Sequence, residues 1–215
     1  MTELLLDRAR GALWDREGRS FEPLARTWSS ERAEPSGDAV GIAEAAIWLQ
    51  RDSGQPCRVP VGVIGARQAP AEICQVAEDL GRALAELGAT VICGGKGGVM
   101  EAACRGVALA EGLAIGLLPD GDWQAANAYV GVPIATGIGV ARNAIIARAS
   151  LCLVAVGGGY GTLSEMAYGL QFGRPVFRLP ESPEVEGAVT LGSVQEAQDA
   201  VARVLLALPP SPDKL

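Results

Sequence analysis

The residues best suited to chemistry in this chain are a glycine-rich stretch and a carboxylate just beyond it. Gly157-Gly158-Gly159-Tyr160-Gly161-Thr162 directly follows an apolar run, and Glu165 comes three residues later. Glycines allow a backbone to approach a phosphate closely, and free N–H groups at the start of a helix favour an anion. The Thr162 hydroxyl adds a further donor. The stretch predicts an anion-binding turn, although it matches neither a P-loop nor a clean G-x-G-x-x-G.

Arg142 is the second candidate, because it opens a helix expected on the same rim as this turn. A guanidinium and a carboxylate beside a bound phosphate suit cleavage of a ribosyl bond. Arg142 would hold the phosphate or ribose, and Glu165 would stabilise a cationic sugar or activate water. The alternative is a surface or helix-capping arginine and a first-turn glutamate favoured by the helix dipole.

Three other turns join a predicted strand to a predicted helix, and two of them supply further ligand-binding candidates. These turns are Gly65-Ala66-Arg67, Gly94-Gly95-Lys96-Gly97-Gly98 and Gly137-Ile138-Gly139. In a parallel α/β sheet, ligands bind outside the carboxyl ends of the strands, where all these turns meet. Gly94, Gly95, Lys96 and Arg67 are therefore expected beside the anion. For Lys96 and Arg67 the alternative is a solvent-facing side chain on a loop.

Short apolar runs alternate with helical patterns from residue 59 nearly to the end. Strands are expected over 59–64, 90–93, 113–118, 132–135, 151–156 and 175–179, and helices over 71–87, 98–110, 141–149, 162–172 and 194–208. Continuous apolar runs are typical of buried parallel strands. The pattern predicts an α/β protein with a Rossmann-like, doubly wound parallel sheet.

Residues 1–57 follow a different pattern and are expected to form a small N-terminal extension to a domain over 58–215. A β-ribbon is predicted from residues 4–6, 12–14 and 19–24, followed by a loop from Ser29 to Asp38 and a helix over 40–51. Three of the four tryptophans lie in this segment: Trp14, Trp28 and Trp48. We expect the extension to pack on the main domain or on a partner; a ligand lid is the other interpretation.

The composition excludes several classes of function. The chain has no histidine, so His-based acid–base catalysis, Ser-His-Asp triads and His metal sites are absent, and no metal site is expected. A net charge of −7 argues against nucleic-acid binding. The five cysteines lack C-x-x-C spacing and indicate small buried residues in a reducing compartment. With no signal peptide or membrane-spanning run, the expected location is the cytoplasm.

Over about residues 59–180 the sequence resembles the LOG family, the cytokinin riboside monophosphate phosphoribohydrolases, and its wider LOG/DprA-like superfamily. The family motif P-G-G-x-G-T-x-x-E is similar to the residues from Gly158 to Glu165, and its two upstream arginines fall on Arg142 and Arg148. The turn from Gly94 to Met100 resembles the family's second-strand motif. The resemblance implies a homodimer and a hydrolysis that requires no cofactor.

Two positions depart from the LOG pattern. Gly157 replaces the proline before the glycines, and Asn143 replaces the lysine after the first arginine. The segment 133–143 is more similar to a sister branch that includes the molybdenum cofactor carrier proteins, which bind a phosphorylated pterin without hydrolysing it. Lysine decarboxylase activity, a label often given to such proteins, is disfavoured because neither lysine stands in a convincing pyridoxal site.

Three hypotheses follow, all involving a phosphorylated, nucleotide-like small molecule or a protein partner. In the first, the protein hydrolyses the N-glycosidic bond of a nucleoside 5′-monophosphate to free base and ribose 5-phosphate. In the second, the same rim carries molybdenum cofactor without chemistry. In the third, the tryptophan-bearing extension makes the chain a partner-binding module. Arg142 and Glu165 would be catalytic only in the first.

Overall fold

The computed structural model describes residues 4–211, which form two compact units. The larger unit comprises residues 59–198. The smaller unit comprises the described residues up to Arg58 together with those from Asp199 onward. The chain passes from the smaller unit to the larger one after Arg58 and returns to the smaller unit at Asp199.

The larger unit is built on seven parallel strands, as the sequence pattern predicts for a Rossmann-like fold. They are β6 (Val61–Gly65), β7 (Val91–Cys93), β8 (Ala114–Leu118), β9 (Val132–Ala135), β10 (Leu153–Val156), β11 (Val176–Arg178) and β12 (Val189–Thr190). Their order is β12-β11-β10-β6-β7-β8-β9, with every pairing parallel. The sequence predicts six strands, and β12 is the additional one.

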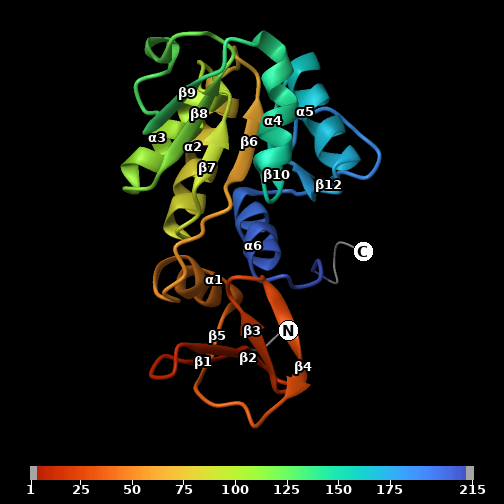
Figure 1. Ribbon diagram of the computed structural model, residues 1–215. Helices are drawn as coiled ribbons and strands as arrows, with labels where there is room; N and C mark the ends of the chain where they lie inside the picture. Colours follow the sequence, from red (N-terminus) through yellow and green to blue (C-terminus); the bar gives the residue numbers. More distant parts are fainter. Residues whose placement is uncertain (1–3, 212–215) are drawn as a thin grey trace. The chain divides into compact units, whose positions relative to one another are not determined.

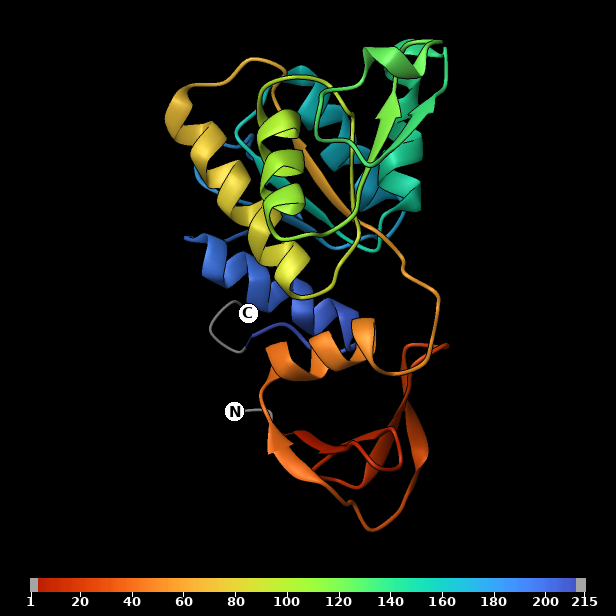
Figure 2. The same ribbon diagram turned by 90° about the vertical axis from the view of Figure 1, so that its left-hand side faces the viewer.

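Helices cover both faces of this sheet, so the doubly wound α/β architecture is confirmed. They are α2 (Ala71–Glu86), α3 (Val99–Leu109), α4 (Arg142–Ala149) and α5 (Tyr160–Gln171), with 3-10 turns at η1 (Trp123–Ala125) and η2 (Gly139–Ala141). Helix α6 (Val194–Leu205) begins in this unit and continues into the smaller one. Helices α4 and α5 lie side by side (Figure 1). Helices α2 and α3 also lie side by side (Figure 2). Among residues 4–211, no helix is long and apolar enough to cross a membrane.

The core that supports the site lies between β10, β6 and the pair α4 and α5. Leu153 and Ala155 of β10 pack with Ile64 of β6, Ile146 of α4 and Met166 of α5, all fully buried or nearly so. Burial of side chains of this size contributes about 1.5–3 kcal/mol each to the free energy of folding. This packing fixes the start of α5 relative to the start of α4.

The smaller unit is an antiparallel sheet, more extensive than a ribbon, with helix α1 and the larger part of α6. Its strands are β1 (Leu4–Asp7), β2 (Ala12–Asp15), β3 (Arg19–Glu22), β4 (Thr27–Arg32) and β5 (Asp38–Val40), in the order β4-β3-β2-β1-β5, and α1 spans Ile42–Arg51. The predicted loop from Ser29 to Asp38 is wrong at both ends, because β4 continues to Arg32 and β5 begins at Asp38. Phe21 and Trp28 pair across β3 and β4 with ring centroids 5.1 Å apart, which extends the sheet into this segment.

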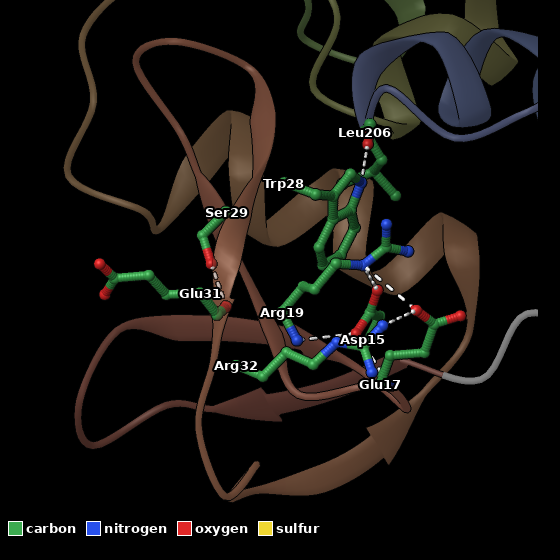
Figure 3. A network of polar contacts seen from close by, with 8 residues as sticks. All are labelled: Asp15, Glu17, Arg19, Trp28, Ser29, Glu31, Arg32 and Leu206. Carbon is green, nitrogen blue, oxygen red and sulfur yellow. Dashed lines mark hydrogen bonds and ion pairs between the residues drawn. The ribbon is translucent and has the colours of Figure 1, made fainter.

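Polar contacts stabilise the smaller unit around Asp15 (Figure 3). The Asp15 carboxylate accepts hydrogen bonds from the Glu17 and Arg19 amides at 2.9 Å and from Arg19 Nε at 2.6 Å. Trp28 Nε1 donates to the carbonyl oxygen of Leu206 at 2.9 Å, which links β4 to the residue just after α6. The Asp15 bonds are local, whereas the bond from Trp28 joins segments that are far apart in the sequence.

Candidate anion-binding site

The turn between β10 and α5 has a backbone that only glycine adopts readily. Gly157 has φ +55° and Gly158 φ +126°, and a Cβ on Gly158 would collide with the side chain of Thr162. Thr162 is therefore packed under the turn and buried. A Cβ on Gly159 or Gly161 would meet nothing within 4 Å, so these two glycines face open space.

The start of α5 presents amide groups to that open space. The helix begins at Tyr160, two residues earlier than predicted, since Leu163 N donates to the carbonyl of Gly159 at 2.9 Å. In the described residues, no protein oxygen accepts a hydrogen bond from the amides of Gly158 and Gly159. Unpaired amides and the positive end of a helix dipole favour a bound anion.

Arg142 and Glu165 lie together behind this turn. Arg142 is the first residue of α4 and Glu165 lies in the second turn of α5, so the packing of these helices brings them together. Arg142 Nη1 is 2.9 Å from Glu165 Oε1, and the two residues are only 8% and 6% exposed. Burial raises the pKa of Glu165 to about 7, although the charge and hydrogen bond of Arg142 act in the opposite direction.

Asn143 completes this cluster, a role that sequence reasoning missed. Its Oδ1 accepts a hydrogen bond from Arg142 Nη1, and its Nδ2 donates to Ser164 Oγ at 2.8 Å and to the carbonyl of Gly161 at 3.4 Å. Ser164 Oγ in turn donates to that same carbonyl at 2.7 Å. The signal was present in the sequence, since Asn143 stands where the LOG pattern has lysine.

The second glycine turn, between β7 and α3, contacts the same arginine. A Cβ on Gly94 would collide with the guanidinium of Arg142, so the absence of a side chain there makes room for it. Met100 Sδ lies on the same side of Gly94. Arg142 is thus enclosed between the turn after β7 and helix α5. Its Nε is buried and has no hydrogen-bond partner among the described residues.

Lys96 is neither free nor solvent-facing. Its Nζ lies 2.8 Å from Asp120 Oδ2 and 2.8 Å from the carbonyl of Ala125, and its side chain is 13% exposed. The hydrogen bond from Lys96 lowers the pKa of Asp120, and the nearby charge of Arg67 lowers it further. Lys96 therefore ties the long loop between β8 and β9 to the second glycine turn.

Three other predicted residues occupy different surroundings. Arg67 is exposed after β6, close to Asp120 on the same rim. Tyr160 is 92% exposed at the first position of α5. Arg148 lies at the far end of α4, where its guanidinium carbon is 4.9 Å from the centre of the Phe172 ring, so it does not join Arg142.

The donor set of this rim suits an anion rather than a metal cation. Backbone amides face the open side of the first turn, and Arg142 lies behind them. Within residues 4–211, no group of three or more His, Cys, Asp or Glu side chains is placed to hold a metal ion. The arrangement can therefore orient a phosphate through amides and, from behind, through a guanidinium.

A Rossmann-like α/β unit with glycine turns at the strand ends defines the class of protein. The sequence profile of the SLOG cluster4 family matches residues 58–205, and the chain belongs to this family. The match confirms the resemblance to the LOG-like superfamily. It covers the whole of the larger unit and excludes residues 1–57.

Three known proteins are similar to this chain. An uncharacterized protein of Archaeoglobus fulgidus is 40% identical over 137 residues, 64% of this chain and 90% of that protein. The solved molybdenum cofactor binding protein from Rippkaea orientalis is 30% identical, with a TM-score of 0.66 over 70% of this chain and 99% of that one. The molybdenum cofactor carrier protein of Chlamydomonas reinhardtii is 31% identical, with a TM-score of 0.62 over 69% and 99%.

Proposed function

We propose that the protein binds molybdenum cofactor, a phosphorylated pterin, at the turn between β10 and α5 and carries it without chemical change. The observation that carries this proposal is the open side of the turn, where Gly159 and Gly161 face free space beside unpaired amides. The phosphate would bind to these amides at the positive end of α5.

The state of the ion pair supports binding without turnover. Arg142 and Glu165 are buried against each other, and Asn143 adds further hydrogen bonds behind the turn. The Glu165 carboxylate, held by Arg142, would then position the turn without contacting the ligand. Two solved proteins named for binding or carrying molybdenum cofactor are also similar to this chain over nearly their whole length.

Retention of the cofactor tests the proposal. Purified protein is mixed with molybdenum cofactor released from a molybdoenzyme, passed through a desalting column, and analysed for molybdenum and oxidised pterin fluorescence. We expect saturable retention near one cofactor per chain, and little change in Glu165→Gln. Retention no greater than that of an unrelated acidic protein would refute the carrier function.

A second candidate is hydrolysis of a nucleoside 5′-monophosphate, which the environment of Glu165 favours. A carboxyl group with a pKa of about 7 is suited to accepting and returning a proton near neutral pH. Glu165 would activate water, the N-glycosidic bond would break, and base and ribose 5-phosphate would be released. Arg142 would hold the phosphate or the ribose.

Incubation with AMP and related monophosphates separates the two candidates. Hydrolysis predicts release of free base detectable by liquid chromatography, and its loss in Glu165→Gln. The carrier function predicts no base from any of them. Cofactor retention without turnover would leave the carrier function as the sole candidate.

We also propose that the protein is a homodimer, as the family resemblance implies, and that it is located in the cytoplasm. Exposed apolar side chains on α4 and α5, those of Ile145, Leu163 and Tyr168, offer a surface for a second copy. Light scattering after size-exclusion chromatography tests the oligomeric state, and a mass of one chain would contradict it.

A further inference from the structure

Two buried thiols lie in contact beneath the second glycine turn. Cys93 is the last residue of β7 and Cys104 lies in the middle of α3, and their sulfur atoms are 3.5 Å apart. Both residues are completely buried. The other three cysteines are also free thiols: Cys152 is buried, Cys74 is half-buried and Cys57 is exposed.

The pair is connected to the turn by hydrogen bonds. Gly95 N donates to Cys93 Sγ at 3.3 Å, so the sulfur supports the turn from below. The Asn127 side chain donates to the carbonyl of Lys96 at 3.0 Å and also lowers the pKa of Cys104. A movement of the Cys93 or Cys104 sulfur atom is therefore expected to shift Gly95 and Lys96 in the turn.

The two thiols differ in their readiness to lose a proton. The hydrogen bond with Cys93, followed by the one from Asn127, lowers the pKa of Cys104. The hydrogen bond with Cys104 and burial hold the pKa of Cys93 well above its usual range. Cys104 therefore has the greater thiolate character, and Cys93 keeps the shared proton.

We propose that Cys93 and Cys104 form a reversible disulfide with hydrogen peroxide as oxidant, and that this bond weakens anion binding at the adjoining rim. The Cys104 thiolate attacks one peroxide oxygen, the O–O bond breaks, and hydroxide leaves a sulfenic acid on Cys104. The Cys93 sulfur then attacks that sulfur. The S–S bond forms, the S–O bond breaks, and water leaves with the Cys93 proton. The thiols lose two electrons, and a dithiol reductant restores them.

Bond formation changes the support of the turn. The two sulfur atoms have to approach each other by roughly 1.5 Å, through rotation of the two side chains or a shift of β7 or α3. Cys93 is bonded to Gly94, where an added Cβ would collide with the guanidinium of Arg142, so the turn is closely packed at this point. Gly95 N also loses its sulfur acceptor in the present geometry. This second half of the proposal rests on the proposed function, since it requires that the rim bind a phosphate.

Peptide mapping tests the bond itself. Reduced protein is treated with hydrogen peroxide, alkylated and digested with trypsin, which cuts after Lys96 and Arg105 and places the two cysteines on separate peptides. We expect a cross-linked peptide pair that dithiothreitol separates. Cys93→Ala and Cys104→Ala should abolish it, while Cys152→Ala, which removes an equally buried thiol, should retain it. No cross-link in wild type, or an equal yield in all three variants, would overturn the proposal.

Phosphate binding tests the consequence. Inorganic phosphate is titrated into reduced and oxidised protein, and we expect binding about tenfold weaker after oxidation, the effect of losing a hydrogen bond to a charged group. Dithiothreitol should restore it, and Cys93→Ala should show no response to peroxide. A cross-link with unchanged affinity would refute the switch. If reduced protein binds neither phosphate nor molybdenum cofactor, the proposed function is wrong. The peptide map then decides by itself whether the disulfide forms.

Discussion

Arg142 Nη1 lies 2.9 Å from Glu165 Oε1, and both side chains are almost completely enclosed by protein. Removing one partner of a buried ion pair leaves the other charge uncompensated, which is more costly than the pair is stabilising. The ion pair therefore holds the start of α4 against the N-terminal part of α5, next to the glycine turn.

Glu165 should make the stability of the protein depend on pH. Because burial raises its pKa to about 7 from an ordinary value of 4.5, the folded protein holds a proton between these values that the unfolded chain has lost. The free energy of unfolding should therefore fall as the pH rises through this range, by at most about 1.4 kcal/mol per pH unit. Urea denaturation of wild type and Glu165→Gln at pH 5 and pH 8 measures this. An identical change in both proteins would contradict it.

Arg142→Met should raise the pKa of Glu165 further, because the arginine is the group that lowers it. Methionine keeps much of the volume without the charge. Titration of the glutamate carboxyl carbons by NMR should show the Glu165 transition at higher pH than in wild type. Arg148→Met is the matched control, since Arg148 contacts Phe172 at the other end of α4 and should leave this transition unchanged.

Asn143→Ala should destabilise the protein more than Ser164→Ala. The asparagine bonds to Arg142, to Ser164 and to the carbonyl of Gly161, whereas the serine hydroxyl takes part in two of the local bonds. Loss of the amide leaves a buried arginine donor unpaired, with an expected cost of about 1–3 kcal/mol. Chemical denaturation of both variants gives the comparison, and equal costs would show that Asn143 has no special role behind the turn.

Two alanine substitutions in the turn should separate folding from binding. Gly158→Ala combines a positive φ with a collision against Thr162, so a loss of about 1–3 kcal/mol is expected. Gly161→Ala places a methyl group in open space within the first turn of α5 and should stabilise the fold by up to about 1 kcal/mol. The same methyl group should reduce retention of molybdenum cofactor. If Gly161→Ala retains as much molybdenum cofactor as wild type, the ligand does not bind on this side of the turn.

Lys96→Met should loosen the loop between β8 and β9. The lysine contacts Asp120 and the carbonyl of Ala125, and hydrogen exchange of residues 119–127 should become faster without it. Asp120→Asn removes the charge of the partner but leaves the lysine in place. If Lys96 binds the ligand directly, Lys96→Met alone will weaken phosphate binding. Similar small effects in both variants would support a role in holding the loop.

The periodicity of the sequence predicts most of the larger unit. Continuous apolar runs mark the buried parallel strands, and the expected ranges agree with those observed to within three residues at each end. Strand β12 escaped prediction because Val189–Thr190 is too short to form an apolar run. Strand β4 escaped because Ser29 to Arg32 is exposed and polar, and only its pairing with β3 makes it a strand.

The site could be predicted in part. Arg142 and Glu165 could be expected near each other, since both follow strands that end at the same rim. Their burial and the raised pKa depend on the packing of α4 against α5, which no local pattern contains. The tie from Lys96 to Asp120 crosses an irregular loop, so its partner was not readable from spacing.

The bond from Trp28 to Leu206 joins residues 178 positions apart, and the whole larger unit lies between them in the chain. The larger unit is thus an insertion within the sequence of the smaller one. During synthesis the N-terminal strands leave the ribosome first, yet their hydrogen-bond partner is made near the end. All strands of the larger unit are therefore synthesised before the smaller unit can be completed. Truncation before Leu206 would consequently damage the N-terminal sheet rather than the anion site.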